Sequence, residues 1–172
     1  MRARRAAPSS EPIADPEAAR EAALRLLERA RRTRTDLARR LKDKGFAANA
    51  IDEALARLER VGLIDDTEYA RAYLAGRWGR RPAGWRQLEQ QLRGRGVSED
   101  AVRAARAQVE ARDGAADEVT LARRLLERSA RRYEKLEPRV RQQRLYALLA
   151  RRGFDGETIR RALALPKSET GH

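Results

Sequence analysis

The stretch Leu37–Leu58, LARRLKDKGFAANAIDEALARL, decides the fold of this chain. Two leucines lie four residues apart before Gly45, and four apolar residues after it follow the i, i+3, i+4, i+7 spacing of one helix face. These residues are Leu37 and Leu41 before the glycine, and Ile51, Ala54, Leu55 and Leu58 after it. A glycine preceded by a basic residue is typical of a helix C-terminus. The stretch therefore predicts two helices that meet at a Gly-Phe corner.

The same pattern occurs twice more, around Gly96 and Gly153, at intervals of 51 (45 to 96) and 57 (96 to 153) residues. In all three copies leucine stands eight and four residues before the glycine, and Ile or Val stands six residues after it. The residue directly before the glycine is always basic, as Lys44, Arg95 and Arg152. A further helical segment precedes each pair, which indicates an internal threefold repeat.

This repeat predicts an all-α protein of three tandem three-helix repeats. We expect the repeats to span residues 17–64, 65–113 and 114–165. Residues 1–16 and 166–172 lack apolar periodicity, so we expect disordered tails there, the first of them basic. Each repeat has few large apolar side chains and should depend on packing against its neighbour. We therefore predict an elongated, slightly curved stack.

The composition suits helices and excludes several kinds of chemistry. Of 172 residues, 38% are charged and 5% aromatic. Cysteine is absent and the single histidine is His172, which argues against thiolate metal sites and imidazole catalysis. No apolar run is long enough to span a membrane, and Met1–Ser10 lacks the apolar stretch of a secretory signal. We expect a cytoplasmic chain that is not an enzyme and holds no metal or cofactor.

The charge balance indicates a polyanionic partner. The chain has 39 basic and 26 acidic residues, a net charge of +13, and nucleic acid is the expected partner of such a surface. Only four of the basic residues are lysines. A GC-rich codon bias would explain the excess of arginine over lysine, but not the surplus of positive charge. Because that surplus is spread over all three repeats, it favours an extended footprint over a single pocket.

Three dense arginine runs lie where the first and second helices of each repeat meet. They are Arg31, Arg32, Arg34, Arg39 and Arg40; Arg77, Arg80, Arg81 and Arg86; and Arg131, Arg132, Arg139, Arg141 and Arg144. Charge runs are often only solvated faces, but three in similar places form a candidate binding surface. The corner residues Lys44, Arg95 and Arg152 join this set, unless they only complement helix dipoles. Trp85 either stacks on a nucleic-acid base or packs in the seam between repeats.

The motif Gly62-Leu63-Ile64-Asp65-Asp66 predicts a turn between repeats. We expect Gly62 to end one helix, Leu63 and Ile64 to be buried, and Asp66 to cap the next helix. Ser98 is a second predicted N-cap. This interpretation gives the motif a structural role rather than direct contact with a partner.

The middle of the chain resembles the RecX regulatory proteins. The resemblance rests on the Gly-Leu-Ile-Asp-Asp turn, a helix with Tyr69-Ala70, a basic loop Arg80-Arg81-Pro82-Ala83-Gly84, and a leucine-rich helix that ends in Arg95-Gly96-Val97. The order and spacing of these motifs match over about residues 17–165.

This resemblance implies a non-catalytic modulator of the RecA recombinase. Such a protein is expected to lie along the groove of the RecA filament on single-stranded DNA, to limit filament growth, and to inhibit strand exchange and ATP hydrolysis by the filament. It would act as a monomer in DNA repair and the SOS response, with weak direct nucleic-acid binding.

Two other classes stay open on the residues alone. A helix-turn-helix DNA-binding protein needs base-reading Asn, Gln or Arg at the start of its recognition helix. Here the helices after the corner glycines begin with small or acidic residues. A helical adaptor scaffold that binds only protein would not need a charge of +13, and its binding would be insensitive to salt. An enzyme is disfavoured, because the sequence offers no nucleophile–base pair, phosphate loop or metal-ligand set.

Overall fold

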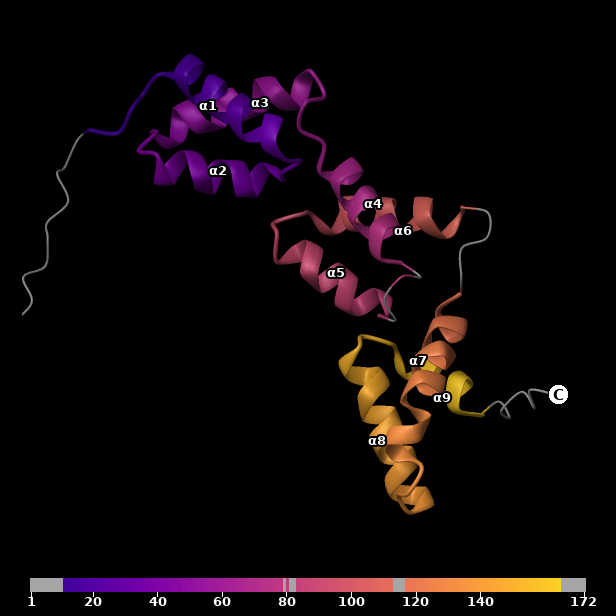
Figure 1. Ribbon diagram of the computed structural model, residues 1–172. Helices are drawn as coiled ribbons and strands as arrows, with labels where there is room; N and C mark the ends of the chain where they lie inside the picture. Colours follow the sequence, from indigo (N-terminus) through magenta and orange to yellow (C-terminus); the bar gives the residue numbers. More distant parts are fainter. Residues whose placement is uncertain (1–10, 79, 81–82, 113–116, 165–172) are drawn as a thin grey trace, which may run out of the picture. The chain divides into compact units, whose positions relative to one another are not determined.

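The computed structural model describes residues 11–78, 80, 83–112 and 117–164. The chain divides into two compact units, one ending at Asp66 and one beginning at Thr67. The first unit contains the first domain, α1 (Pro16–Arg29), α2 (Arg34–Asp43) and α3 (Ala48–Arg60) (Figure 1). The second unit contains the second and third domains. The second domain consists of α4 (Asp66–Arg77), α5 (Trp85–Arg93) and α6 (Glu99–Glu110), and its first residue, Asp66, is counted with the first unit. The third domain consists of α7 (Glu118–Tyr133), α8 (Pro138–Arg151) and α9 (Gly156–Ala164).

Side-chain caps explain where several helices begin. Each capping oxygen accepts a backbone N–H of the first turn, which otherwise has no partner within the helix. The caps are Asp15 for α1, Thr33 for α2, Ser98 for α6, Asp117 for α7 and Asp155 for α9. The predicted cap at Ser98 is confirmed, with a distance of 3.2 Å from its Oγ to the Ala101 nitrogen.

The three corner glycines adopt the same conformation. Their φ angles are 89° at Gly45, 78° at Gly96 and 83° at Gly153, in the left-handed region that favours glycine. In each corner the next residue donates its backbone N–H to the carbonyl of the leucine four positions before the glycine, at 3.2 Å. The recurrence of this turn confirms the predicted repeat.

Each three-helix domain has its own apolar core. The first core contains Ala22, Ala23, Leu37, Leu41, Ile51, Leu55, Leu58 and Ile64. The second contains Ala70, Tyr73, Leu74, Trp85, Leu88, Leu92, Val97, Val102, Ala105 and Val109. The third contains Val119, Leu121, Ala122, Leu125, Leu149, Phe154, Ile159 and Ala162. The repeated Leu and Ile or Val positions are all buried, apart from the half-buried Leu145.

The all-α prediction of three three-helix units is therefore confirmed. Within the described residues the structure contains no β-strand, only an isolated bridge between Ile13 and Phe46. None of the described helices has the length and apolar character of a membrane span.

Part of the predicted N-terminal tail is held against the first domain. The N–H of Ile13 donates to the Gly45 carbonyl at 2.8 Å, and the Ile13 carbonyl accepts the N–H of Ala47 at 2.8 Å. The prediction of a disordered tail through residue 16 is thus wrong for residues 11–16. The corner between α2 and α3 provides hydrogen-bond partners for the backbone N–H and carbonyl of Ile13. Residues 1–10 and 166–172 lie outside the described residues.

The Gly62–Asp66 motif differs from its prediction in two positions. Gly62 ends α3 with a φ of 73° and Ile64 is buried, as expected. Leu63 is 54% exposed, so its predicted burial is wrong. The Asp66 carboxylate accepts the backbone N–H of Arg34 at 3.0 Å, at the start of α2, instead of capping the helix that it begins. The motif that follows α3 therefore bonds to the start of α2 through Asp66.

The second and third domains meet at a close joint. The rings of Trp78 and Trp85 stack with centroids 3.6 Å apart. The Trp85 backbone N–H donates to the Glu118 carboxylate at 2.9 Å, and burial raises the pKa of that carboxyl. The Gly84 N–H donates to the Arg152 carbonyl at 2.8 Å. A Cβ atom on Gly84 would lie 2.3 Å from the Gly153 oxygen. A residue with a side chain at position 84 would therefore force the backbones at Gly84 and Gly153 apart.

Candidate polyanion-binding surface

The first arginine run surrounds one carboxylate. Asp36 on α2 forms ion pairs with Arg32 at 2.9 Å, Arg39 at 2.6 Å and Arg40 at 2.8 Å. Burial raises the pKa of Asp36, but the hydrogen bonds from Arg40, Arg39 and Arg32 outweigh it and lower that pKa to about 2. A single carboxylate therefore engages three arginines of the run, but it cancels only one of their three positive charges.

The remaining contacts of this run are also structural. Arg34 pairs with Asp52 at 3.3 Å and with Glu59 at 3.2 Å, which joins α2 to α3. The Arg32 Nε donates to the Leu26 carbonyl near the end of α1, at 3.2 Å. Arg31 is exposed. We conclude that the first run mainly holds the three helices of the first domain together.

Asp36 was not among the predicted site residues, although the spacing of two of its arginine partners along α2 indicates their contact. Arg39 and Arg40 stand three and four residues after this aspartate on α2, where side chains on one helix face meet, and Arg32 reaches it from the segment before the helix. A count of arginines does not show that three of them share the carboxylate of Asp36.

Replacing Asp36 with asparagine should destabilise the first domain by about 1–2 kcal/mol, allowing for solvent screening of a partly exposed cluster. Because the folded-state pKa lies below the ordinary value of 3.8, this contribution is present above about pH 4 and is lost as the pH falls toward 2. Urea denaturation followed by circular dichroism at several pH values would measure it. The exposed Asp43, which forms no ion pair within the described residues, gives the matched variant Asp43→Asn. Equal stability of the two variants would contradict the structural role of Asp36.

One arginine of the second run, Arg77, and the corner residue Arg95 pack on the ring of Tyr73. The guanidinium carbons of Arg77 and Arg95 lie 3.7 and 4.8 Å from the centre of its ring. Arg95 also donates to the Gln91 carbonyl at 2.7 Å, which supports its interpretation as a residue that complements a helix C-terminus. Arg80 and Arg86 are exposed, whereas Arg81 lies outside the described residues.

The Trp85 ring lies in the core of the second domain, and the Trp85 backbone N–H bonds to Glu118 of the third domain. It is 2% exposed, its ring stacks on Trp78, and the Arg106 guanidinium lies 5.0 Å from its ring centre. The base-stacking interpretation of Trp85 therefore does not hold in this conformation, because neighbouring side chains cover the ring.

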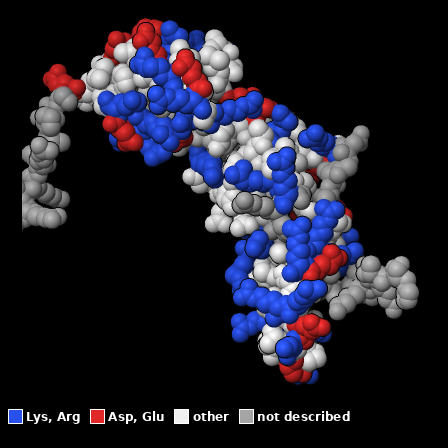
Figure 2. All heavy atoms as spheres, viewed as in Figure 1, with Lys and Arg blue, Asp and Glu red and all other residues white. Residues whose placement is uncertain are grey.

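The third run differs from the first because its charges have no acidic partner among the residues that the structure describes. We call five arginines at the end of α7 and in the first half of α8 the α7–α8 basic surface. They are Arg131, Arg132, Arg139, Arg141 and Arg144. All are exposed except the half-buried Arg141, and none forms an ion pair with a described residue. Figure 2 shows Lys and Arg covering much of the visible face over α7 and α8, with a few acidic side chains among them. This surface leaves its guanidinium groups available to phosphates or carboxylates outside the chain.

The corner residues do not behave as one set. Lys44 is exposed and forms no ion pair within the described residues. Arg152 is exposed as well, while its carbonyl takes part in the joint with Gly84. In the part of the chain that the structure describes, no three His, Cys, Asp or Glu side chains gather in a way that could hold a metal ion.

Three tandem three-helix domains define the chain as a helical-repeat protein, and the five arginines of the α7–α8 basic surface form no ion pair with a described residue. Family models for the first, second and third three-helix domains of RecX match residues 19–58, 65–105 and 116–163. The chain belongs to the RecX family.

Two relatives, both named regulatory protein RecX, span most of the chain. The protein of Thermobifida fusca is 42% identical over 138 residues, which cover 79% of this chain and 71% of that protein. The protein of Streptomyces coelicolor is 34% identical over 171 residues, which cover 96% of this chain and 89% of that protein.

Solved structures support the fold. A crystal structure of RecX from Lactobacillus salivarius has a TM-score of 0.77 at 23% identity, and the match covers 87% of this chain and 95% of that one. A crystal structure of a regulatory protein RecX also has a TM-score of 0.77, at 25% identity, with 87% of this chain and 73% of that one covered.

Proposed function

We propose that this chain is a non-catalytic regulator that binds the RecA recombinase as its filament on single-stranded DNA. It limits filament growth and inhibits strand exchange and ATP hydrolysis by the recombinase. It acts as a monomer, in the cytoplasm where the recombinase works on DNA, within DNA repair and the SOS response. Its own residues supply binding and no chemistry.

The α7–α8 basic surface is the observation that carries this proposal beyond the family name. A single strand inside a protein filament presents a row of phosphates, and arginine can donate two parallel hydrogen bonds to each of them. The arginines on this surface would not have to break an internal ion pair to make such contacts. Those around Asp36 would have to break theirs, so we assign the contacts to the third run rather than to the first.

The structure offers less support for a helix-turn-helix mode of binding. The helix after the second corner, α6, begins with Glu99 and Asp100, both exposed. Carboxylates at the start of a recognition helix would be repelled by the phosphates that flank the major groove.

Co-sedimentation with RecA tests the proposal. We expect the protein to sediment with RecA filaments assembled on single-stranded DNA, and less with RecA alone. The same preparation should reduce strand exchange and the ATPase activity of the filament, while showing no ATPase or nuclease activity by itself. Binding to bare duplex DNA without any effect on RecA would instead support the helix-turn-helix class. Binding to RecA that is insensitive to salt would support the adaptor scaffold.

A further inference from the structure

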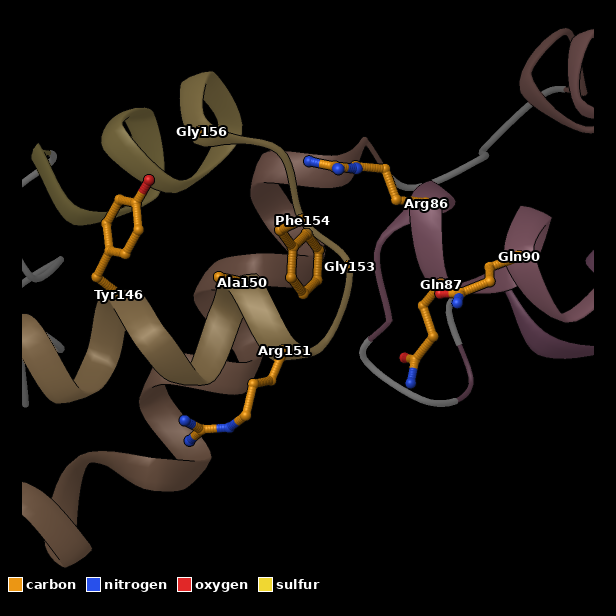
Figure 3. A pocket seen from close by; sticks show the side chains of 9 residues that line it. All are labelled: Arg86, Gln87, Gln90, Tyr146, Ala150, Arg151, Gly153, Phe154 and Gly156. Carbon is orange, nitrogen blue, oxygen red and sulfur yellow. The ribbon is translucent and has the colours of Figure 1, made fainter.

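A cleft opens between the second and third domains, beside the joint at Gly84. Its volume is about 290 Å³. Arg86, Gln87 and Gln90 of α5 line one side, and Tyr146 and Arg151 of α8 line the other, with Phe154 after the third corner glycine between them (Figure 3). Both walls belong to one compact unit, so the cleft is part of the fold of that unit.

The walls of this cleft are basic and polar. Arg86 and Arg151 are exposed, and neither forms an ion pair with a described residue. No acidic side chain is among the residues that line the described cleft. The side-chain amides of Gln87 and Gln90 add neutral hydrogen-bond donors and acceptors to the lining. A ligand that enters here meets two guanidinium groups and neutral hydrogen-bonding groups.

The aromatic ring at the cleft supplies an independent observation. Tyr146 is 44% exposed, a large fraction for an aromatic side chain in a chain with so few of them. It projects from α8 toward α9 at the edge of the cleft (Figure 3). Exposed aromatic rings beside arginines are the platform on which single-stranded nucleic acids stack their bases.

We infer that this cleft binds one nucleotide of single-stranded DNA. Arg86 and Arg151 hold the phosphates on either side of it, Tyr146 stacks on the base, and the glutamine amides bond to the base edge. This inference rests on the proposed function, in which the filament contains single-stranded DNA, and it names a site where this chain touches the strand directly. The base-stacking residue is then Tyr146 rather than the buried Trp85.

An acidic protein segment fits these observations less well. Carboxylates would pair with the two arginines, but they would gain nothing from an exposed aromatic ring. A nucleotide uses the charges, the ring and the amides together, and it contains all three complementary groups in one unit.

The first test measures binding of the full-length protein to a fluorescein-labelled oligothymidylate by fluorescence anisotropy, with no recombinase present. Tyr146→Ala should weaken binding about tenfold, since stacking of one base contributes about 1–3 kcal/mol. Tyr146→Phe keeps the ring and should bind within about twofold of the original chain. Tyr133→Ala removes a half-buried ring of the third domain that does not line the cleft, and it should have little effect.

A second test separates the cleft from general electrostatic attraction. Arg86→Ala with Arg151→Ala should weaken oligothymidylate binding about tenfold more than Arg93→Ala with Arg128→Ala. The control pair removes the same charge from exposed arginines of α5 and α7 that do not line the cleft. Equal losses in the two pairs would overturn the inference.

The remaining outcomes decide between ligands. Unchanged oligothymidylate binding by Tyr146→Ala would overturn the inference, and so would absence of binding by the original chain at low salt. If Arg86→Ala with Arg151→Ala loses binding to a labelled polyglutamate but still binds oligothymidylate, the inference is overturned and the cleft is assigned to an acidic protein partner. Because the assay contains no recombinase, a failure here is distinct from a failure of RecA inhibition, which co-sedimentation and strand exchange report.

Discussion

Replacing Arg139 and Arg144 with glutamate should weaken inhibition of strand exchange about a hundredfold. Each arginine contributes a charge-assisted hydrogen bond to phosphate of about 1.5 kcal/mol or more, and 1.4 kcal/mol corresponds to tenfold in affinity. The glutamates would also repel the phosphates. The variant should fold, because Arg139 lies in the first turn of α8, where a negative side chain complements the helix dipole, and Arg144 is exposed. Dose–response curves for inhibition of RecA strand exchange would measure the change.

The matched control reverses the same number of charges at paired arginines. Arg25 pairs with Glu21 and Arg103 pairs with Asp100, and both arginines are well exposed. Arg25→Glu with Arg103→Glu should reduce inhibition far less than the α8 variant. If both variants lose inhibition equally, net charge rather than the α7–α8 basic surface governs binding.

Replacing Gly153 with alanine should destabilise the second unit by about 2–5 kcal/mol. The left-handed conformation at a φ of 83° costs a residue with a Cβ about 1–2 kcal/mol. The new Cβ would also lie 2.4 Å from the Gln87 nitrogen, and relieving such a contact requires the joint to open, at about 1–3 kcal/mol more. Urea denaturation followed by circular dichroism would give the change in the free energy of unfolding.

Gly45 provides the comparison for this variant. Its φ is 89°, but a Cβ there would meet no atom within 4 Å. Gly45→Ala should therefore cost only the conformational term, about 1–2 kcal/mol. Both tryptophans, Trp78 and Trp85, lie at the joint, so Gly153→Ala should also change the tryptophan fluorescence of the folded protein, and Gly45→Ala should not. Equal effects of the two variants on stability and fluorescence would contradict the joint.

Much of the fold could be predicted because it depends on local spacing. The leucines at fixed offsets from Gly45, Gly96 and Gly153 encode both the helix faces and the turn between them, and each falls within one short stretch of chain. The N-cap at Ser98 is local as well. Such features need no knowledge of which distant residues come together.

The errors arose where distant residues meet. Asp66 bonds to the N–H of Arg34, 32 residues earlier, and no local pattern shows that partner. The Trp85 ring is covered by Trp78 and Arg106, which come from other parts of the same repeat, and no local pattern shows these partners. The cleft beside Tyr146 likewise exists only because α5 and α8 pack at the Gly84–Gly153 contact.

For the arginine runs, the sequence located the residues but not their roles. The first and third runs look alike as sequence, yet one encloses Asp36 and the other has no carboxylate partner among the described residues. Ion pairing depends on side-chain geometry, so a count of charges cannot separate a structural cluster from a surface open to a partner.

The most direct measurement is the salt dependence of binding to RecA filaments on single-stranded DNA, for the original chain and for Arg139→Ala with Arg144→Ala. We predict that affinity falls steeply with salt for the original chain, and that the variant loses about 1.4 from the slope of log affinity against log salt, about 0.7 for each phosphate contact on a single strand. A flat salt response, or the same slope for both proteins, would contradict the assignment of the α7–α8 basic surface as the part of this chain that binds the filament.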